Sequence, residues 1–353
     1  MNKLMVLFLA AALPAIAQDD IMPRPPKPAP VGGVLARLIH DTRVGEAQQN
    51  KNLTILPLFS ADHAPRGYWT LDQALAKDVL RISEKGEGSV PELLAENLSD
   101  EPVFLLAGEI VTGGKQNRVV SQDILLAPHS GAIGLGVFCV EQGRWTQQTR
   151  YFGVEKYMAH AALRLDLNAP SVSQSAVWGE VARKNGAVAG AMPNPTGYLG
   201  TMYESSQVKR NLDDYTKAIV WTQDANGMAV MIGERVVGVE IFGDSETFGK
   251  LRDKLLRSYA VDALEEAAVV KPVTARVSVE RFLQTAHQAS LRPKETIGLG
   301  RLFGIEGGRV YGSVLTWDRQ HAAHGVVHAS LFEDLRGESQ PPVSPRPFPR
   351  YRD

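Results

Sequence analysis

The chain has 353 residues, of which 44% are hydrophobic and 22% charged, an ordinary composition for a globular protein with a sizeable core. The formal net charge of −1 gives no overall field that would hold nucleic acid or an anionic membrane, so neither is an expected partner. The single cysteine, Cys139, excludes an intramolecular disulfide and a cysteine-based zinc site.

The first 17 residues have the pattern of a secretory signal peptide. Lys3 precedes the apolar run LMVLFLAAAL, and the small residues Ala15-Ile16-Ala17 form a cleavage site before Gln18. This run is too short for a stable membrane span, and no later segment is long and apolar enough to cross a bilayer. We therefore expect an exported protein, periplasmic or extracellular, that is cleaved after Ala17.

Proline-rich segments flank the expected folded body. Residues 18–33 contain five prolines, which favour an extended, solvated linker with nothing to bury. Residues 334–353 end in PPVSPRPFPRYRD, which has the same chemistry and predicts a disordered tail. The folded domain is therefore expected at residues 34–333.

The first part of this domain, residues 50–150, is predicted to be rich in strands. Apolar or alternating runs indicate strands at LTILPLF, VFLLAGEIV, VVSQDILL and AIGLGVFCV. In the last of these, the alternation places Cys139 on the apolar face, whereas Gly134 and Gly136 lie on the other face, where a neighbour must approach closely. Thr70 and Gln73 fit a capping box, which predicts a short helix after Thr70.

The middle of the domain, residues 171–222, shows helical spacing of apolar residues. One helix is expected to stop at Gly186, and two further runs continue the pattern around Tyr198 and Leu212. Helices and strands are mixed over residues 227–333. There Gly233-Glu234 suits a type II′ hairpin turn and Ser278 is a candidate helix cap.

This order of a strand-rich N-terminal half, a helical middle and a mixed C-terminal part predicts an α+β fold. A short internal echo joins AGEIVTG at 107–113 with IGERVVG at 232–238, since both have Gly-Glu between apolar segments. The echo could mark a duplicated unit or be a coincidence, and the sequence leaves both open.

Four segments of the chain resemble a known protein family. The segments LLAGEIVTGGKQNRVVSQDILLAP, VFCVEQGRW, VMIGERVVGVEIFG and GLGRLFGIEGGRVYGSVLTW resemble blocks of a bacterial domain-of-unknown-function family. That family is named for its association with ADP-ribosylglycohydrolase and rhodanese-phosphatase genes. The resemblance implies one domain over roughly residues 34–333 and emphasises the GGKQNR and CVEQGRW segments. It implies no reaction and no cofactor.

The GGKQNR segment holds the first candidate ligand-binding residues, Lys115, Gln116, Asn117 and Arg118, directly after Gly113-Gly114. Two glycines allow an anion-binding nest, and the two cations add charge-assisted donors. The spacing is not that of a Walker phosphate loop. The alternative is a loop in which the two amides satisfy neighbouring backbone groups and the cations are solvated.

The CVEQGRW segment supplies Arg144 and Trp145 as further ligand-binding candidates. The strands before and after the turn at 127–131 should pair antiparallel, which brings Arg118 beside Glu141. Glu141 and Glu109 are candidate catalytic acids or bases, and Glu109 is also placed to neutralise Lys115 or Arg118. The alternatives are a strand-end ion pair for Glu141 and a solvated turn residue for Glu109.

Two other reactive groups favour structural interpretations. Cys139 is expected to be an inert buried thiol. His321, His324 and His328 would share a helical face and could bind a metal, but Gly325 and the valines after it favour a strand, so no metal site is assigned and His328 is expected to pack with a satisfied nitrogen.

These observations suggest a periplasmic binding or accessory domain with a polar pocket that accepts an anionic small molecule or peptide. The alternative is a hydrolase-type enzyme that uses the same pocket with Glu109 or Glu141 as acid or base. The sequence identifies neither a cofactor nor an oligomeric state.

Overall fold

The computed structural model describes residues 32–61, 67–169, 171–190, 198–266, 274–317 and 325–334. The predicted signal peptide, most of the proline-rich linker and most of the C-terminal tail lie outside these residues. The predicted limits need small corrections at both ends. Helix α1 (Gly32–His40) includes the last two residues of the expected linker, since its apolar face packs on the domain. The N–H of Asp334 donates to the carbonyl of Arg309 (2.8 Å), so the first tail residue extends the domain.

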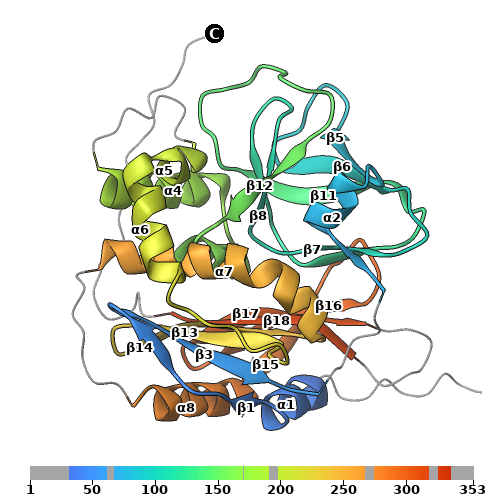
Figure 1. The fold of residues 1–353 in the computed structure, drawn as a ribbon. Helices are drawn as coiled ribbons and strands as arrows, with labels where there is room; N and C mark the ends of the chain where they lie inside the picture. Colours follow the sequence, from blue (N-terminus) through green and yellow to red (C-terminus); the bar gives the residue numbers. More distant parts are fainter. Residues whose placement is uncertain are drawn as a thin grey trace, which may run out of the picture.

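A nine-stranded antiparallel sheet, called the large sheet below, forms the base of the domain (Figure 1). Its order is β1-β3-β13-β14-β18-β17-β16-β15, and β2 also pairs with β3. N-terminal strands therefore lie beside strands from the second half of the chain. The strands are β1 (Arg43–Val44), β2 (Gln48–Asn50), β3 (Leu53–Phe59), β13 (Gly227–Ile232), β14 (Arg235–Phe242), β15 (Ser290–Lys294), β16 (Arg301–Gly307), β17 (Val310–Trp317) and β18 (Gly325–Glu333).

A second, six-stranded sheet has the order β12-β8-β9-β11-β6-β5. Its two end strands are joined through the segment that leads into β12. Tyr151 of this segment forms a β-bridge with Ser83 of β5, and the N–H of Phe152 donates to the carbonyl of Ile82 (2.8 Å). The sheet thus closes on itself and is called the closed sheet below. Its strands are β5 (Leu80–Glu84), β6 (Glu92–Asn97), β8 (Glu109–Thr112), β9 (Arg118–Val120), β11 (Gly131–Cys139) and β12 (Gly153–Met158).

A small third sheet of β10 (Ile124–Leu126), β7 (Val103–Leu105) and β4 (Trp69–Thr70) adjoins the closed sheet. Helix α2 (Leu71–Ala76) follows β4 and has the predicted capping box at Thr70 and Gln73, so that prediction is confirmed. This arrangement shows an α+β fold with strands in the first part, helices in the middle and strands again towards the C-terminus.

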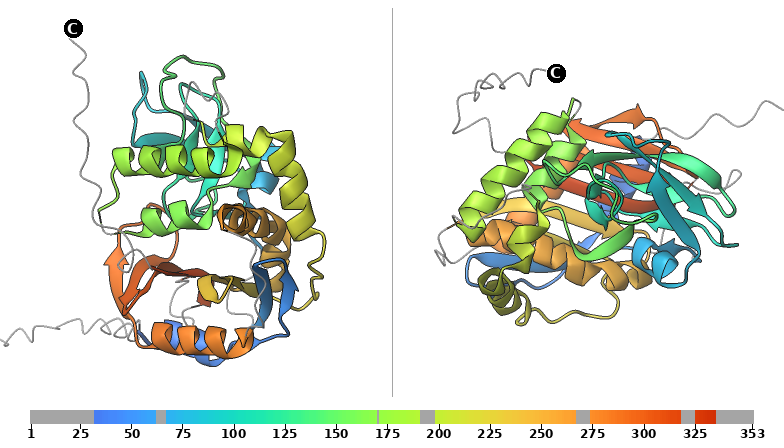
Figure 2. Two further views of the ribbon diagram at one scale, coloured as in Figure 1. Left: turned by 90° about the vertical axis from the view of Figure 1, so that its left-hand side faces the viewer. Right: turned by 90° about the horizontal axis from the view of Figure 1, so that it is seen from above.

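Helices cover both faces of the large sheet (Figure 2). Helices α1 and α8 (Ala275–His287) lie on its lower face, and α7 (Ser245–Glu265) lies on its upper face, between the two sheets. The remaining helices pack beside α7 and the closed sheet; they are α3 (Ala161–Asn168), α4 (Gln174–Ala189), α5 (Gly200–Glu204) and α6 (Ser206–Thr216).

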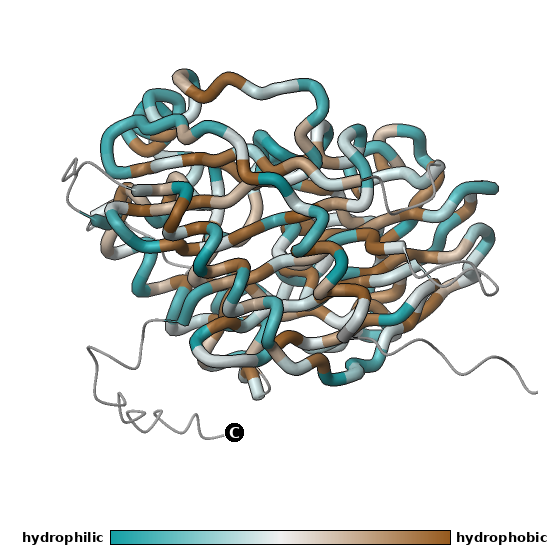
Figure 3. The backbone as a smooth tube through the Cα atoms, turned by 90° about the horizontal axis from the view of Figure 1, so that it is seen from below, coloured by the Kyte–Doolittle hydropathy of each residue, from teal (hydrophilic) through white to brown (hydrophobic). Residues whose placement is uncertain are grey.

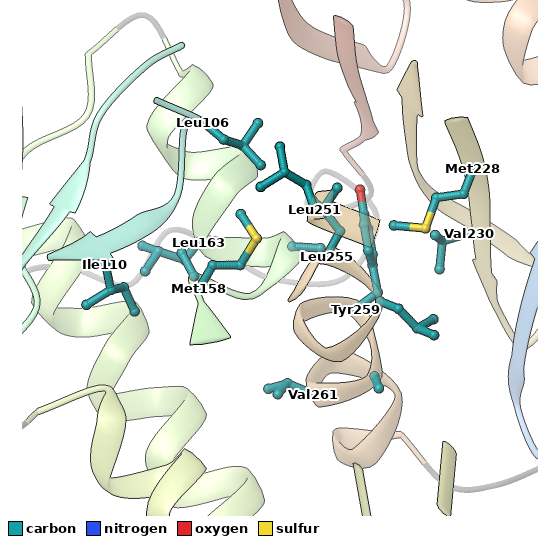
Figure 4. Packing of buried hydrophobic residues seen from close by; sticks show 14 of the residues in the cluster. Leu106, Ile110, Met158, Leu163, Met228, Val230, Leu251, Leu255, Tyr259 and Val261 are labelled. Carbon is teal, nitrogen blue, oxygen red and sulfur yellow. The ribbon is translucent and has the colours of Figure 1, made fainter. Parts of the chain in front are cut away.

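Three apolar clusters follow from these layers. One lies between the large sheet and helices α1 and α8, and another fills the closed sheet. The largest cluster joins the two halves through α7, with Leu251 and Leu255 between Met158 and Met228 in Figure 4. Hydrophobic and hydrophilic residues alternate along much of the backbone in Figure 3, as expected for elements with one buried face.

The structure confirms several local predictions and corrects others. Strand β11 turns Cys139 inwards, and a Cβ on Gly134 would lie 1.8 Å from Glu92 Oε1, the end of a flexible side chain that can move away. The hairpin from β13 to β14 has a two-residue turn in which Gly233 has φ 59°, as a type II′ turn requires. Helix α4, however, passes the predicted stop at Gly186 and ends at Ala189, because a single glycine costs a packed helix only about 1 kcal/mol.

One further interpretation was wrong, and one question that the sequence left open is answered by the described strands. Ser278 lies inside α8, which begins one turn earlier after Thr274, because Ala275 also packs on the core. The two segments of the internal echo differ in structure. Residues 232–238 span a hairpin turn, whereas residues 107–113 contain β8, which begins at Glu109 and pairs with β9 and β12 but not with β7. The echo therefore does not correspond to a repeated structural unit.

Candidate functional site

The two segments singled out in the sequence meet at one end of the closed sheet. Strands β9 and β11 pair antiparallel with Arg118 opposite Cys139. Just beyond that pair, the N–H of Asn117 donates to Glu141 Oε2 (3.2 Å). The loops 85–91, 113–117 and 140–152 lie together here, and we call this place the loop end of the closed sheet (Figure 1).

Arg144 ties these loops to one another. Its guanidinium forms an ion pair with Glu141 Oε2 (2.6 Å) and donates to the carbonyls of Gly114 (3.0 Å) and Thr146 (3.1 Å) and to Asn117 Oδ1 (3.2 Å). Glu141 is buried and occupied by Arg144 and by the Asn117 N–H. Both residues thus hold the loop in place, as the strand-end ion pair interpretation expects.

The glycines before Lys115 do form a turn with positive φ, 124° at Gly113 and 47° at Gly114. The predicted anion nest is, however, filled by the protein itself. The N–H of Gly113 donates to Asn117 Oδ1 (3.0 Å), that of Gly114 to Thr149 Oγ1 (3.1 Å) and that of Lys115 to Glu84 Oε1 (2.6 Å). These backbone donors therefore stabilise the loop.

Lys115 and Trp145 also serve the local structure. The ammonium group of Lys115 donates to the carbonyl of Glu87 and lies 5.5 Å from the centroid of the Trp145 ring. The same ring lies 5.7 Å from the guanidinium carbon of Arg118. Trp145 is 45% exposed, so one indole covers both cations from the solvent side. Gln116 is buried in the same turn.

Arg118 differs from the other cations at the loop end. Its side chain is fully buried, and none of its three guanidinium nitrogens has a hydrogen-bond partner among the described residues. Alternation along the strand places it on the same inward face as Val120, which belongs to the interior core. Burial lowers the pKa of Arg118, and nearby Cys139, Glu84 and Glu141 partly offset that effect. Of the three cations expected to converge here, Lys115 and Arg144 bind neighbouring groups, whereas Arg118 has no hydrogen-bond partner among the described residues.

Cys139 faces Arg118 and is buried, as expected. Burial raises the pKa of its thiol to about 11, although Arg118 acts in the opposite direction. The thiol therefore stays protonated at neutral pH, and a nucleophilic role has no support here.

Glu109 lies apart from the loop segment, against the expectation that it neutralises Lys115 or Arg118. It is fully buried, accepts from the N–H of Leu106 (2.9 Å) and pairs with Lys254 of α7 (3.1 Å). Burial raises the pKa of Glu109, and Lys254 opposes the shift. Lys254 therefore neutralises Glu109 in place of Lys115 or Arg118.

A second polar cluster, missed by the sequence reasoning, lies between the large sheet and the helices above it. Glu240 pairs with Arg164 (2.5 Å), accepts from the Tyr259 hydroxyl (2.5 Å) and contacts His328 Nε2 (3.0 Å). His328 Nδ1 contacts Asp123 Oδ2 (2.7 Å), so both ring nitrogens are satisfied as expected. The available signal was a single charged residue inside each of several apolar runs, as in VVGVEIF.

This cluster has balanced charges and no exposed member. Burial alone would lower the pKa of His328, but Asp123 and Glu240 raise it to about 9. Burial would raise the pKa of Glu240, but Arg164 and His328 hold it at about 2. The cluster therefore links the two halves of the domain electrostatically. A Cβ on Gly108, which has φ 95°, would lie 2.8 Å from Arg164 Cγ, so this glycine makes room for the arginine.

Metal binding finds no geometric basis in the described part of the chain, which contains no group of three potential ligands. His321 and His324 lie outside the described residues, so the metal interpretation of HAAHGVVH concerns only His328 here. No described helix is long and apolar enough to cross a membrane.

Two cavities of the described structure have charged residues in their linings. One, of about 540 Å³, lies beside α3, α4 and α7, where Lys184 pairs with Asp262 (2.5 Å) and Arg235 with Glu266. Another, of about 350 Å³, lies beside the loop end and is lined by Glu84, Arg150 and Tyr151 among others. Glu84 also acts electrostatically on Arg118, which does not line this cavity.

Fold and site together define an α+β domain with a closed sheet whose loop end buries an unpaired arginine. The chain belongs to the family of the ARG and Rhodanese-Phosphatase-superfamily-associated Protein domain, a domain of unknown function, whose model matches residues 41–332. The resemblance seen in the sequence is thereby confirmed. Neither a curated protein nor a solved structure shows significant similarity to the chain.

Proposed function

We propose that the chain is an exported binding protein whose loop end receives the anionic group of a small ligand on Arg118. One observation carries this proposal: a fully buried guanidinium whose three nitrogens have no partner among the described residues. A buried charge without a partner costs the fold several kcal/mol, and proteins keep such costs mainly at functional sites. A carboxylate or a phosphate would supply the missing acceptors, since both match the planar guanidinium fork.

The surroundings of Arg118 support a binding role. Arg144, Asn117 and Glu141 fix the loops without using Arg118, so the site is organised before a ligand arrives. The indole of Trp145 lies over the guanidinium, where it can move aside or pack against the ligand. Export is supported by the apolar N-terminal run and the Ala15-Ile16-Ala17 motif.

The alternative of a hydrolase that uses Glu109 or Glu141 has weaker support. Each carboxylate already has a cationic partner, Lys254 and Arg144 respectively, and each also accepts a backbone N–H. A general base needs access to a substrate proton, and a paired carboxylate must first lose its partner. We therefore place binding first.

Isothermal titration calorimetry of the mature protein tests the proposal. Acetate, succinate, inorganic phosphate and the free amino acids are the probes, and they separate carboxylate from phosphate ligands. We expect Arg118→Met to abolish the binding that the wild type shows. Arg281→Met is the matched control, because Arg281 is exposed on α8, on the far side of the large sheet. Equal binding by wild type and Arg118→Met would reject the proposal.

A further inference from the structure

A second unpaired group lies beside Arg118. Glu84, at the end of β5, follows the buried residues Leu80 and Ile82 at alternate positions, so its side chain points to the interior of the closed sheet. Its Oε1 accepts from the N–H of Lys115 (2.6 Å), whereas its Oε2 is buried with no partner among the described residues. The loop end thus combines unused donors on Arg118 with an unused acceptor on Glu84.

Glu84 raises the pKa of Arg118 through its charge without forming a direct hydrogen bond to it. Both are fixed by their backbone surroundings. Strand pairing holds Arg118 opposite Cys139, and the Lys115 N–H holds the Glu84 carboxylate. Gly114 allows this approach, because a Cβ there would lie 2.6 Å from Glu84 Oε1. The guanidinium of Arg118 and the carboxylate of Glu84 have opposite charges and are not bonded to each other, so a small molecule could bridge them.

The charge balance of this pair selects the ligand. A simple anion would be attracted by Arg118 but repelled by the carboxylate of Glu84. A simple cation would be attracted by Glu84 but repelled by Arg118. A neutral zwitterion satisfies both groups. We propose, building on the proposed function, that the ligand is a small zwitterion of the amino-acid class, with its carboxylate on Arg118 and its ammonium group on Glu84 Oε2.

The position of the two groups limits the size of the ligand. Glu84 also lines a cavity of about 350 Å³, but Ser83, Leu94 and Glu96 in the same lining alternate with the inward-facing residues of β5 and β6. That cavity therefore lies on the outer face of the closed sheet, away from the Arg118 side chain. The buried position of Arg118 restricts the bridging part to a few atoms.

The test compares matched ligands on the mature protein. A thermal-shift screen of the twenty common L-amino acids selects the best ligand, and calorimetry then compares it with its des-amino acid. We expect the amino acid to bind at least tenfold more tightly. Glu84→Gln should reduce amino-acid binding to the level of the des-amino acid, whose own binding should stay the same or increase. Arg118→Met should abolish both.

The outcomes separate this inference from the proposed function. If the des-amino acid or inorganic phosphate binds as well as the amino acid, and binding requires Arg118, the inference is wrong and the proposed function stands. If no probe shows Arg118-dependent binding, both are wrong. The comparison of ligands on the wild type remains decisive even if Glu84→Gln fails to fold.

Discussion

Arg118 and Cys139 face each other as a directly opposed pair on β9 and β11, which places a guanidinium beside a thiol in the interior of the closed sheet. Both side chains are fully buried. A thiolate would neutralise the arginine, but burial raises the pKa of Cys139 to about 11, so the thiol remains neutral. The thiol therefore does not neutralise the positive charge of Arg118.

The first prediction concerns that thiol. Native protein should react with a thiol reagent at neutral pH far more slowly than urea-unfolded protein, since Cys139 is buried and protonated. Cys139→Ser should lower the free energy of unfolding by about 1 kcal/mol, because a more polar hydroxyl replaces the thiol. Rapid labelling of the native protein would contradict the inert role.

The second prediction concerns the pH dependence of stability. The folded-state pKa of His328 is about 9, above its ordinary value of 6.5. Its contribution is thus fully present below pH 6.5 and is lost as the pH rises towards 9. The loss amounts to roughly 3 kcal/mol at about 1.4 kcal/mol per pKa unit. Urea unfolding at several pH values should show this decline in the wild type and a smaller one in His328→Gln, and equal declines would refute the assignment.

The third prediction uses two glycines with similar backbone and different surroundings. Gly114 and Gly86 have φ of 47° and 58°, so alanine strains both by about 1–2 kcal/mol. A Cβ at Gly86 meets nothing within 4 Å, whereas one at Gly114 would lie 2.2 Å from Phe152 Cζ. Gly114→Ala should therefore lower the free energy of unfolding by about 1–3 kcal/mol more than Gly86→Ala. Equal losses in urea unfolding would show that the loop relaxes.

Much of the fold could be predicted because local patterns and tertiary structure agree. The alternation in AIGLGVFCV places Cys139 correctly, and Thr70 with Gln73 predicts the start of α2. The pairing of β3 with β13 and the closure of the six-stranded sheet were not predictable. They depend on contacts between residues far apart in the chain, which leave no periodic signal in either segment.

The candidate site was predicted only in part for a similar reason. The expected antiparallel pairing brought 113–118 and 141–145 together correctly, although β10, which lies between β9 and β11 in the chain, pairs with β7 in the small third sheet. It could not show that Arg144 binds backbone carbonyls while Arg118 has no hydrogen-bond partner among the described residues. Glu84 was missed because its strand, β5, reaches the loop end only when the sheet closes.

The fourth prediction concerns export. The signal-peptide pattern ends at Ala17, and the described domain begins at α1, well after that position. Protein recovered from a bacterial periplasm should have Gln18 as its first residue. Mass spectrometry of the intact chain measures this directly, and a retained Met1 in the exported fraction would count against the assignment.

The last prediction separates the two arginines of the loop end by the sign of their effect on stability. Arg118→Met removes a buried charge that has no hydrogen-bond partner in the described part of the chain, and a methionine fits the apolar interior, so the ligand-free protein should gain about 1–3 kcal/mol. Arg144→Met breaks the bonds to Glu141 and Gly114 and leaves Glu141 buried without its cation, so the protein should lose about 3–5 kcal/mol. Urea unfolding of the dialysed variants measures both values. If Arg118→Met is as destabilising as Arg144→Met, Arg118 has a structural role and the loop end is a clamp; opposite signs would indicate that the fold keeps a costly charge for a ligand.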